Sequence, residues 1–214
     1  MKEELQMPCL DDKLFQDFNK DYRYNATLNS GIDGFFLFSE GYRIAAERLF
    51  EQFDDSGWDA NTLVYPFIFL NRQFLELRLK ELISGLNFTL SHEYKFPNGH
   101  CLKTLWDTFK SLMVKRKESP VKQSDFDNTE RLIKEFVSID PQSFSFRYPV
   151  DTTEKRNPSL KIRNMDLLNF MTTMKKLYYF FEIQSDVVYY YIDLTEEFLN
   201  IMHSEYLSSM HENY

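Results

Sequence analysis

LVYPFIFLNRQFLELRLKELISG, residues 63–85, is the most apolar helical stretch of the chain, and the fold prediction starts from it. Its apolar side chains recur three and four residues apart along two adjoining stripes, a pattern typical of a helix buried on more than one side. One stripe contains Phe67, Leu70, Phe74 and Leu77, and the other contains Ile68, Leu75, Leu79, Leu82 and Ile83. The stretch is therefore predicted to be the central helix of the protein.

The ends of this helix carry suitable residues. Asp59 or Asn61 is suited to capping its start, and Pro66 lies where a proline is tolerated in a first helical turn. Gly85 follows the last periodic residue and is suited to a left-handed C-terminal cap. A connection is then expected up to Gly99.

A charged row lies on the same helix. Arg72, Glu76 and Lys80 are four residues apart, so they share one line of the helix, and Glu76 can pair in both directions. One interpretation is a solvated edge with surface ion pairs, each contributing about 0–1 kcal/mol. The other is a polar cleft wall that presents Arg72 to an anion or a partner. The solvated edge is favoured, because charge runs on helices usually face water.

Helical periodicity continues through the rest of the chain. Helices are expected over residues 35–53, from about His100, from Asp127 (with Glu130 completing a capping box) and over 159–214. The last segment has no glycine or proline and is interpreted as two helices broken near Ser185, because one helix of that length would reach well beyond a small domain. The prediction is an all-α bundle of five to seven helices with a long C-terminal helical segment. Residues 1–30 are expected to form an N-terminal extension and 31–214 a single domain.

Composition narrows the compartment and the chemistry. The 214 residues carry a net charge of −8, so a basic surface for nucleic acid is not implied. Two cysteines make no disulfide framework and fit a reducing cytoplasm, where we expect the protein to reside. No apolar run is long enough to span a membrane, and no metal or cofactor motif is present. His203 and His211 are eight residues apart, too far to bind one metal ion without help. We therefore expect no metal, cofactor or membrane partner.

Three short motifs follow one another along the chain in an order that can be compared with known families. They are LKEL at 79–82, GHCL at 99–102 and RYP at 147–149. In this order the chain resembles the HEPN superfamily over about residues 35–185. The resemblance implies a helical bundle that is frequently a dimer. Many HEPN proteins are metal-independent ribonucleases of toxin–antitoxin, abortive-infection or antiviral systems. Others bind RNA, a nucleotide or a nucleotidyltransferase partner without catalysis.

The chain departs from the nuclease version of the family. That version has an arginine followed, after four to six residues, by a histidine, and none of His92, His100, His203 and His211 has an arginine at that distance. We therefore predict a non-catalytic module that binds RNA, a nucleotide or a partner, in prokaryotic stress or defence. The expected partners are a second copy, an antitoxin or a nucleotidyltransferase.

Two alternatives remain open. One is a divergent ribonuclease using Arg72, His100 and Arg147, which would form a cationic pocket for phosphate if they converge. Further ligand-binding candidates are Glu76, Lys80, Tyr148 and Asp151, although Arg147 and Asp151 have an equal claim to fastening the long 142–158 loop. The other alternative is a structural dimer whose interface is the aromatic C-terminal region. There Tyr178, Tyr179 and Tyr189–Tyr191 are more readily explained by packing than by base stacking.

Overall fold

The computed structural model describes residues 7–15, 20–28, 34–53, 59–116 and 121–211. Contacts divide the chain into two units, Met1–Gly34 and Phe35–Tyr214. The predicted boundary between residues 30 and 31 falls outside the described residues. In the first unit the described element is a short 3₁₀ helix, η1 (Tyr22–Tyr24), whose first turn is held by hydrogen bonds from the Arg23 backbone and side chain to the Asp21 carboxylate.

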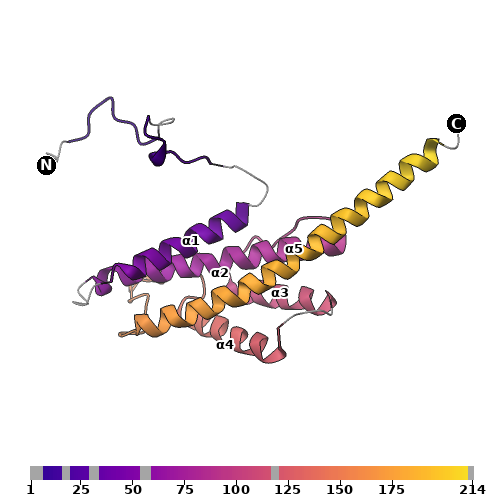
Figure 1. Ribbon diagram of the computed structural model, residues 1–214. Coiled ribbons are helices and arrows are strands. Elements are labelled where there is room, and N and C mark those ends of the chain that lie inside the picture. The colour runs from indigo at the N-terminus through magenta and orange to yellow at the C-terminus, as the bar shows by residue number, and fades with distance from the viewer. Residues whose placement is uncertain (1–6, 16–19, 29–33, 54–58, 117–120, 212–214) are drawn as a thin grey trace. The chain divides into compact units, whose positions relative to one another are not determined.

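The second unit is a bundle of helices (Figure 1). In the described residues these are α1 (Gly34–Glu51), α2 (Ala60–Ser91), α3 (Leu102–Arg116), α4 (Gln123–Ile139) and α5 (Leu167–His211). The described residues contain no strand, and the one isolated bridge pairs Val150 with Pro158. The predicted all-α fold is confirmed. Within the part of the chain described, no helix is both long and apolar enough to cross a membrane.

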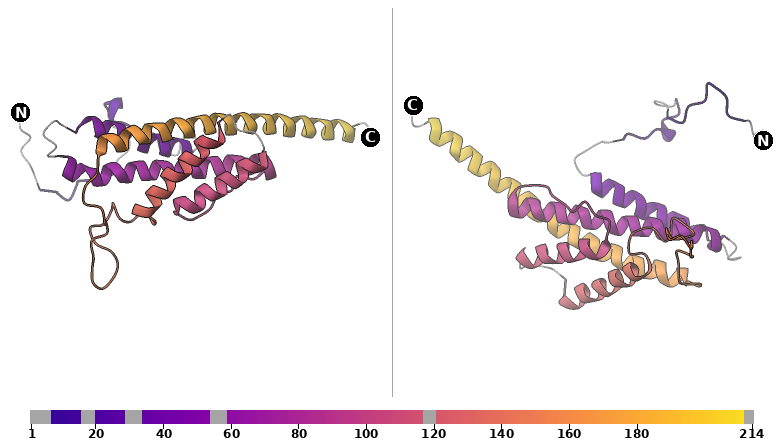
Figure 2. Two further views of the ribbon diagram at one scale, coloured as in Figure 1. Left: turned by 90° about the horizontal axis from the view of Figure 1, so that it is seen from below. Right: turned by 180° about the vertical axis from the view of Figure 1, so that it is seen from behind.

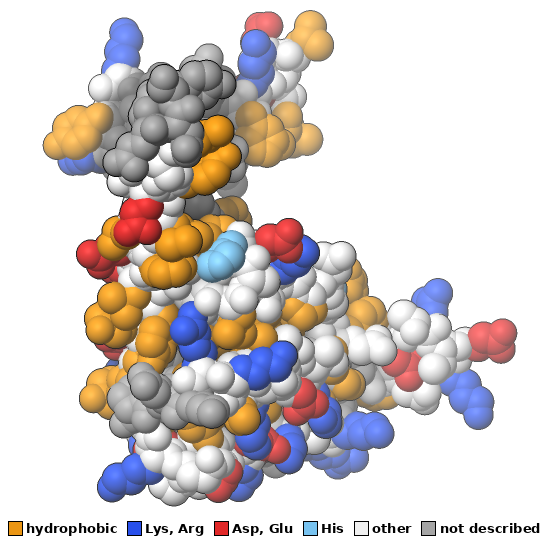
Figure 3. All heavy atoms as spheres, turned by 90° about the vertical axis from the view of Figure 1, so that its right-hand side faces the viewer, with side chains coloured by type: hydrophobic (Ala, Val, Ile, Leu, Met, Phe, Trp, Pro, Cys, Tyr) orange, Lys and Arg blue, Asp and Glu red, His pale blue; other side chains and the backbone are white. Residues whose placement is uncertain are grey.

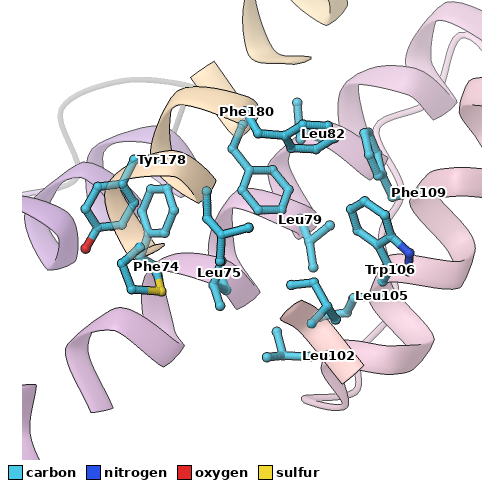
Figure 4. Close-up of a cluster of buried hydrophobic side chains, with 14 of the residues drawn as sticks. Phe74, Leu75, Leu79, Leu82, Leu102, Leu105, Trp106, Phe109, Tyr178 and Phe180 are labelled. Atoms are coloured by element: carbon cyan, nitrogen blue, oxygen red, sulfur yellow. The ribbon is translucent and has the colours of Figure 1, made fainter. Parts of the chain in front are cut away.

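Helix α2 is the centre of this bundle, as its sequence predicts. Helices α3 and α5 pack against it, and α5 crosses α2 at an angle (Figure 1). Figure 4 shows the core between these helices, where Leu79 and Leu82 of α2 face Trp106 and Phe109 of α3 and Phe180 of α5. Most of both predicted stripes is fully buried, while Leu70 and Leu77 are half-buried. Each large apolar side chain buried here stabilises the fold by roughly 1.5–3 kcal/mol.

The predicted C-terminal end of α2 is wrong. The helix continues through Gly85 to Ser91 and ends at His92, which adopts the left-handed conformation with φ 60°. Gly85 instead marks a close approach of two helices. A Cβ atom at this position would lie 2.6 Å from Val188 Cγ1 and 3.0 Å from Ile192 Cδ1 of α5. The glycine is therefore a packing residue, and the predicted connection begins only after residue 91.

The prediction of two helices after residue 159 is also wrong. Helix α5 is one continuous helix of 45 residues, about 68 Å long. Ser185, the predicted break, is buried within the helix, and its hydroxyl accepts a hydrogen bond from Arg78 Nη1 at 3.3 Å. The first part of α5 packs against α2, and its C-terminal part projects past the end of the bundle (Figures 1 and 2).

The start of α4 differs from the prediction by one turn. It begins at Gln123 rather than at Asp127, and the Asp125 carboxylate accepts a hydrogen bond from the Lys122 backbone N–H at 3.1 Å. The acidic residue that supports the helix start is thus Asp125 rather than Glu130.

Candidate functional site

A charged cluster centred on Glu76 is buried inside the bundle. Arg72 Nη1 donates to Glu76 Oε2 at 3.0 Å, and Lys80 Nζ donates to Glu76 Oε1 at 3.0 Å. The three residues are 0%, 2% and 6% exposed for Arg72, Glu76 and Lys80. The favoured prediction of a solvated edge is therefore wrong. The packed helices shield this line of α2 from water, and the one carboxylate of Glu76 pairs with both cations.

His100 joins the cluster from the segment that precedes α3. Its Nδ1 lies 2.7 Å from Glu76 Oε1, and Arg72 Nη2 donates to the His100 backbone carbonyl at 2.5 Å. The imidazole nevertheless reaches solvent, since its side chain is 70% exposed. A nitrogen that faces a carboxylate carries the proton in the neutral imidazole, so Glu76 fixes both the tautomer and the orientation of His100. The cluster thereby ties the start of α3 to α2.

The electrostatics of the cluster follow from its burial. Burial disfavours the charged form of Glu76, but hydrogen bonds from His100 and Lys80 and the charge of Arg72 outweigh it, so the pKa of the carboxyl lies below its ordinary value of 4.5. Burial lowers the pKa of the Arg72 guanidinium, and the nearby charge of Glu76 partly offsets this effect. An arginine remains a cation even so. Within the described residues, Arg72 Nε is buried without a hydrogen-bond partner.

Cys101 stands next to His100 and was not among the predicted site residues. The Thr104 backbone N–H and hydroxyl lower the pKa of its thiol, and Arg72 adds a smaller effect of the same sign. The thiol is half-buried at the start of α3. Its position in the GHCL motif was the available signal for this residue.

The three predicted residues of the long loop lie apart from this cluster. Arg147 Nε donates to the Ser143 carbonyl at 2.5 Å, and its guanidinium carbon lies 5.8 Å from the centre of the Phe69 ring of α2. Tyr148 is half-exposed and contacts that guanidinium at 5.6 Å. Within the described residues, no hydrogen bond or ion pair joins Arg147, Tyr148 or Asp151 to Glu76, Arg72, Lys80 or His100.

Asp151 closes the loop on itself. Its Oδ1 accepts hydrogen bonds from the Thr153 hydroxyl at 2.6 Å and from the backbone N–H groups of Thr153 and Asn157, both at 3.1 Å. These bonds lower the pKa of the Asp151 carboxyl, the hydroxyl of Thr153 contributing most. Arg147 fastens the loop near α2, and Asp151 shapes its tip. Arg147 and Asp151 therefore fasten and shape the loop, and they do not share a site with Arg72, Glu76, Lys80 and His100.

A second charged cluster, missed by the sequence analysis, joins α1, α2 and α5. Arg78 pairs with Glu40 of α1 and, at 3.0 Å, with Glu81 of α2. Tyr189 of α5 donates its hydroxyl hydrogen to Glu81 Oε1 at 3.1 Å. The spacing of Arg78 and Glu81 on an apolar helix was the available signal, but Glu40 reaches them only through the packing of α1. The contacts of this second cluster indicate that it holds α1, α2 and α5 together.

A groove lies between α4 and the first part of α5. It encloses about 920 Å³ and is bordered by both helices and by the 160–166 segment that leads into α5. Its floor is apolar, with Phe136 and Leu132 from α4 and Phe170, Leu177 and Phe180 from α5. The charged side chains that line it are of both signs, Arg131 and Lys176 with Asp125, Glu135 and Asp166. A cavity of this volume and lining is typical of a binding site.

The projecting part of α5, residues 193–211, exposes an apolar face and is called the arm below. Its large apolar side chains are about half exposed, between 43% and 59% each. They are Leu194, Phe198, Ile201, Met202, Tyr206, Leu207 and Met210. Figure 3 shows hydrophobic side chains standing at the surface of the molecule among acidic and basic ones. The sequence contains no lysine or arginine after Lys176, whereas Asp193, Glu196, Glu197 and Glu205 make the arm acidic.

Comparisons with models of protein families, with curated proteins and with solved structures find no match to this chain. In the described residues, no group of three or more His, Cys, Asp or Glu side chains is arranged to hold a metal ion. The likeness to HEPN therefore remains a resemblance in three short motifs.

Proposed function

We propose that this protein is a non-catalytic helical module that assembles with a second copy of itself through the arm. The observation that carries the proposal is the exposed apolar face that Leu194, Phe198, Ile201 and Met202 form at spacings of three and four residues. A helix in water normally presents polar residues on its solvent face, and a contiguous exposed apolar patch marks an interaction site.

The exposed area is large enough for a stable interface. Seven large side chains of the arm are each about half exposed. At roughly 200 Å² for a side chain of this size, they offer on the order of 700 Å² per copy. A stable interface between two proteins buries about 800 Å² on each partner, so the arm supplies most of one side.

The charged cluster favours this function over phosphate or RNA binding. Arg72 and Lys80, two of the cations expected to contact a phosphate, are buried and paired with Glu76. Binding to a nucleic-acid backbone depends on cations that are free to replace counterions. The wider expectation of a role in prokaryotic stress or defence rests on the resemblance to HEPN alone.

Size-exclusion chromatography with light scattering tests the proposal. The wild-type chain of 25.8 kDa is expected to elute with twice that mass. Phe198→Glu places a charge in the apolar face and is expected to yield the monomer. Asn200→Glu, at an exposed position about 200° around the same helix from Phe198, is the matched control and is expected to remain a dimer. A monomeric wild type, or a dimer of Phe198→Glu with unchanged circular dichroism, would refute the proposal.

One observation favours a second candidate, the divergent ribonuclease. His100 presents an exposed imidazole whose Nδ1 is held by the buried Glu76 carboxylate, an arrangement that orients a general base. Incubation of RNA with the wild type, His100→Ala and the control His92→Asn separates the two candidates. Cleavage that only His100→Ala abolishes would support the ribonuclease, and absence of cleavage in all three would exclude this route.

A further inference from the structure

The groove and the apolar face of the arm lie on the same side of α5. Phe180 and Ile183 line the groove, and Phe198 and Ile201 lie on the arm. Phe180 and Phe198 are separated by 18 residues, as are Ile183 and Ile201, which corresponds to about five full turns. One face of a single helix therefore borders the groove in its first part and is exposed apolar surface in its last part.

The arm cannot fill the groove of its own chain. Both belong to one unbroken helix, and their centres are about 28 residues, or roughly 42 Å, apart along its axis. A second copy removes this limit, because an antiparallel partner helix brings its own arm to the groove.

The groove lining carries charges of both signs, Asp125, Glu135 and Asp166 with Arg131 and Lys176, and the basic side chains beside it belong to the segment that leads into α5 and to the start of α5. Residues 160–176, which border the groove, contain four basic side chains and one acidic side chain, whereas the arm contains four acidic and no basic side chains. Lys161, Arg163, Lys175 and Lys176 form no ion pair within the described part of the chain. Complementary charge steers association and fixes the register of two surfaces.

We propose that two copies pair with their α5 helices antiparallel, so that the arm of each copy occupies the α4–α5 groove of the other. This inference rests on the proposed self-association and adds the surface that receives the arm. Groove centre meets arm centre when the twofold axis passes near Val187, with Thr173 of one copy facing Ile201 of the other.

The area agrees with such a reciprocal interface. Two arms together contribute on the order of 1,400 Å² of apolar side-chain surface, within the range of about 1,200–2,000 Å² buried in stable interfaces. Each arm also covers half-buried apolar side chains of the groove, such as Leu132 and Phe136.

Directed disulfide formation tests the register. In a background with Cys9→Ser and Cys101→Ser, the single variants Thr173→Cys and Ile201→Cys are purified separately, mixed, and oxidised with oxidised glutathione. Two cysteines form a disulfide only when their Cα atoms come within about 7 Å. The mixture is expected to form a disulfide-linked dimer on non-reducing electrophoresis, and neither variant alone is expected to do so.

Two results would overturn the inference without deciding whether the arm mediates self-association, which light scattering tests separately. Disulfide formation by Ile201→Cys alone would show that the two arms contact each other near Ile201 rather than the groove. A mixture that remains unlinked, although light scattering shows an arm-dependent dimer, would show that the arm binds elsewhere on the second copy. Replacing Ile201→Cys with His203→Cys is the control, since a position two residues further along the helix points about 200° away from Ile201 and should remain unlinked.

Discussion

Replacing Glu76 with glutamine tests whether the fold depends on the buried charged cluster. Glutamine keeps the size of the side chain but removes its charge. Arg72, which is 0% exposed, and Lys80, which is 6% exposed, would then lose the carboxylate with which both are paired. Removing one partner of a buried ion pair costs about 3–5 kcal/mol, because an uncompensated charge remains in a region of low dielectric constant. We expect a loss of that size in the free energy of unfolding.

Urea and thermal unfolding, followed by circular dichroism at pH 7, measure this loss. In a protein of this length each kcal/mol shifts the Tm by about 2–4 °C, so the expected decrease is roughly 6–20 °C. Glu135→Gln is the matched control. Glu135 also follows an arginine by four residues and lies 3.6 Å from it, but the side chains of Arg131 and Glu135 are 66% and 68% exposed. An exposed pair of this kind contributes at most about 1 kcal/mol.

The reasoning would be refuted if Glu76→Gln lost no more stability than Glu135→Gln. A second variant separates lost charge balance from lost packing. Replacing Arg72, Glu76 and Lys80 together with Met, Leu and Met removes all three charges at similar volume, and such replacements are often neutral or stabilising. We expect the triple variant to be more stable than Glu76→Gln.

Three further predictions follow from the core and its charges. The pKa of Glu76 in the folded state lies below its ordinary value of 4.5, so the stability that its charge supplies is complete above pH 4.5 and is lost as the pH falls through the folded-state pKa. When the free energy of unfolding is measured at decreasing pH, it should therefore fall less in Glu76→Gln than in the wild type. In Gly41→Ala the added Cβ meets open space, so the free energy of unfolding should rise by about 0.5–1 kcal/mol. In Gly85→Ala the added Cβ overlaps α5, so the free energy of unfolding should fall by about 1 kcal/mol. Denaturant unfolding of both variants measures these changes. Tyr178→Phe removes a buried hydroxyl that donates a hydrogen bond to an α2 side chain and should cost about 1–3 kcal/mol, against little change for the exposed Tyr179→Phe; equal Tm values would contradict this.

The periodic apolar pattern alone determined the fold class and the central helix. Residues repeated every three to four positions can be buried together only on a helix, so α1, α2 and α3 were predictable as helices, and α2 also with its main buried face. Local signals for helix ends were less reliable. Gly85 has the residue type of a C-terminal cap, but its role depends on Val188 and Ile192, which are more than 100 residues away in the chain.

The sequence predicted which residues of the candidate site are neighbours on one helix, but it did not predict whether they are buried or exposed. Spacing alone placed Arg72, Glu76 and Lys80 on one line of α2, and the GHCL motif singled out His100. Only the tertiary structure decided that this line is buried and that Arg147 belongs to a different part of the molecule. Burial is a property of the helices packed around a residue, and a charged row on a helix has the same spacing whether it faces water or the core.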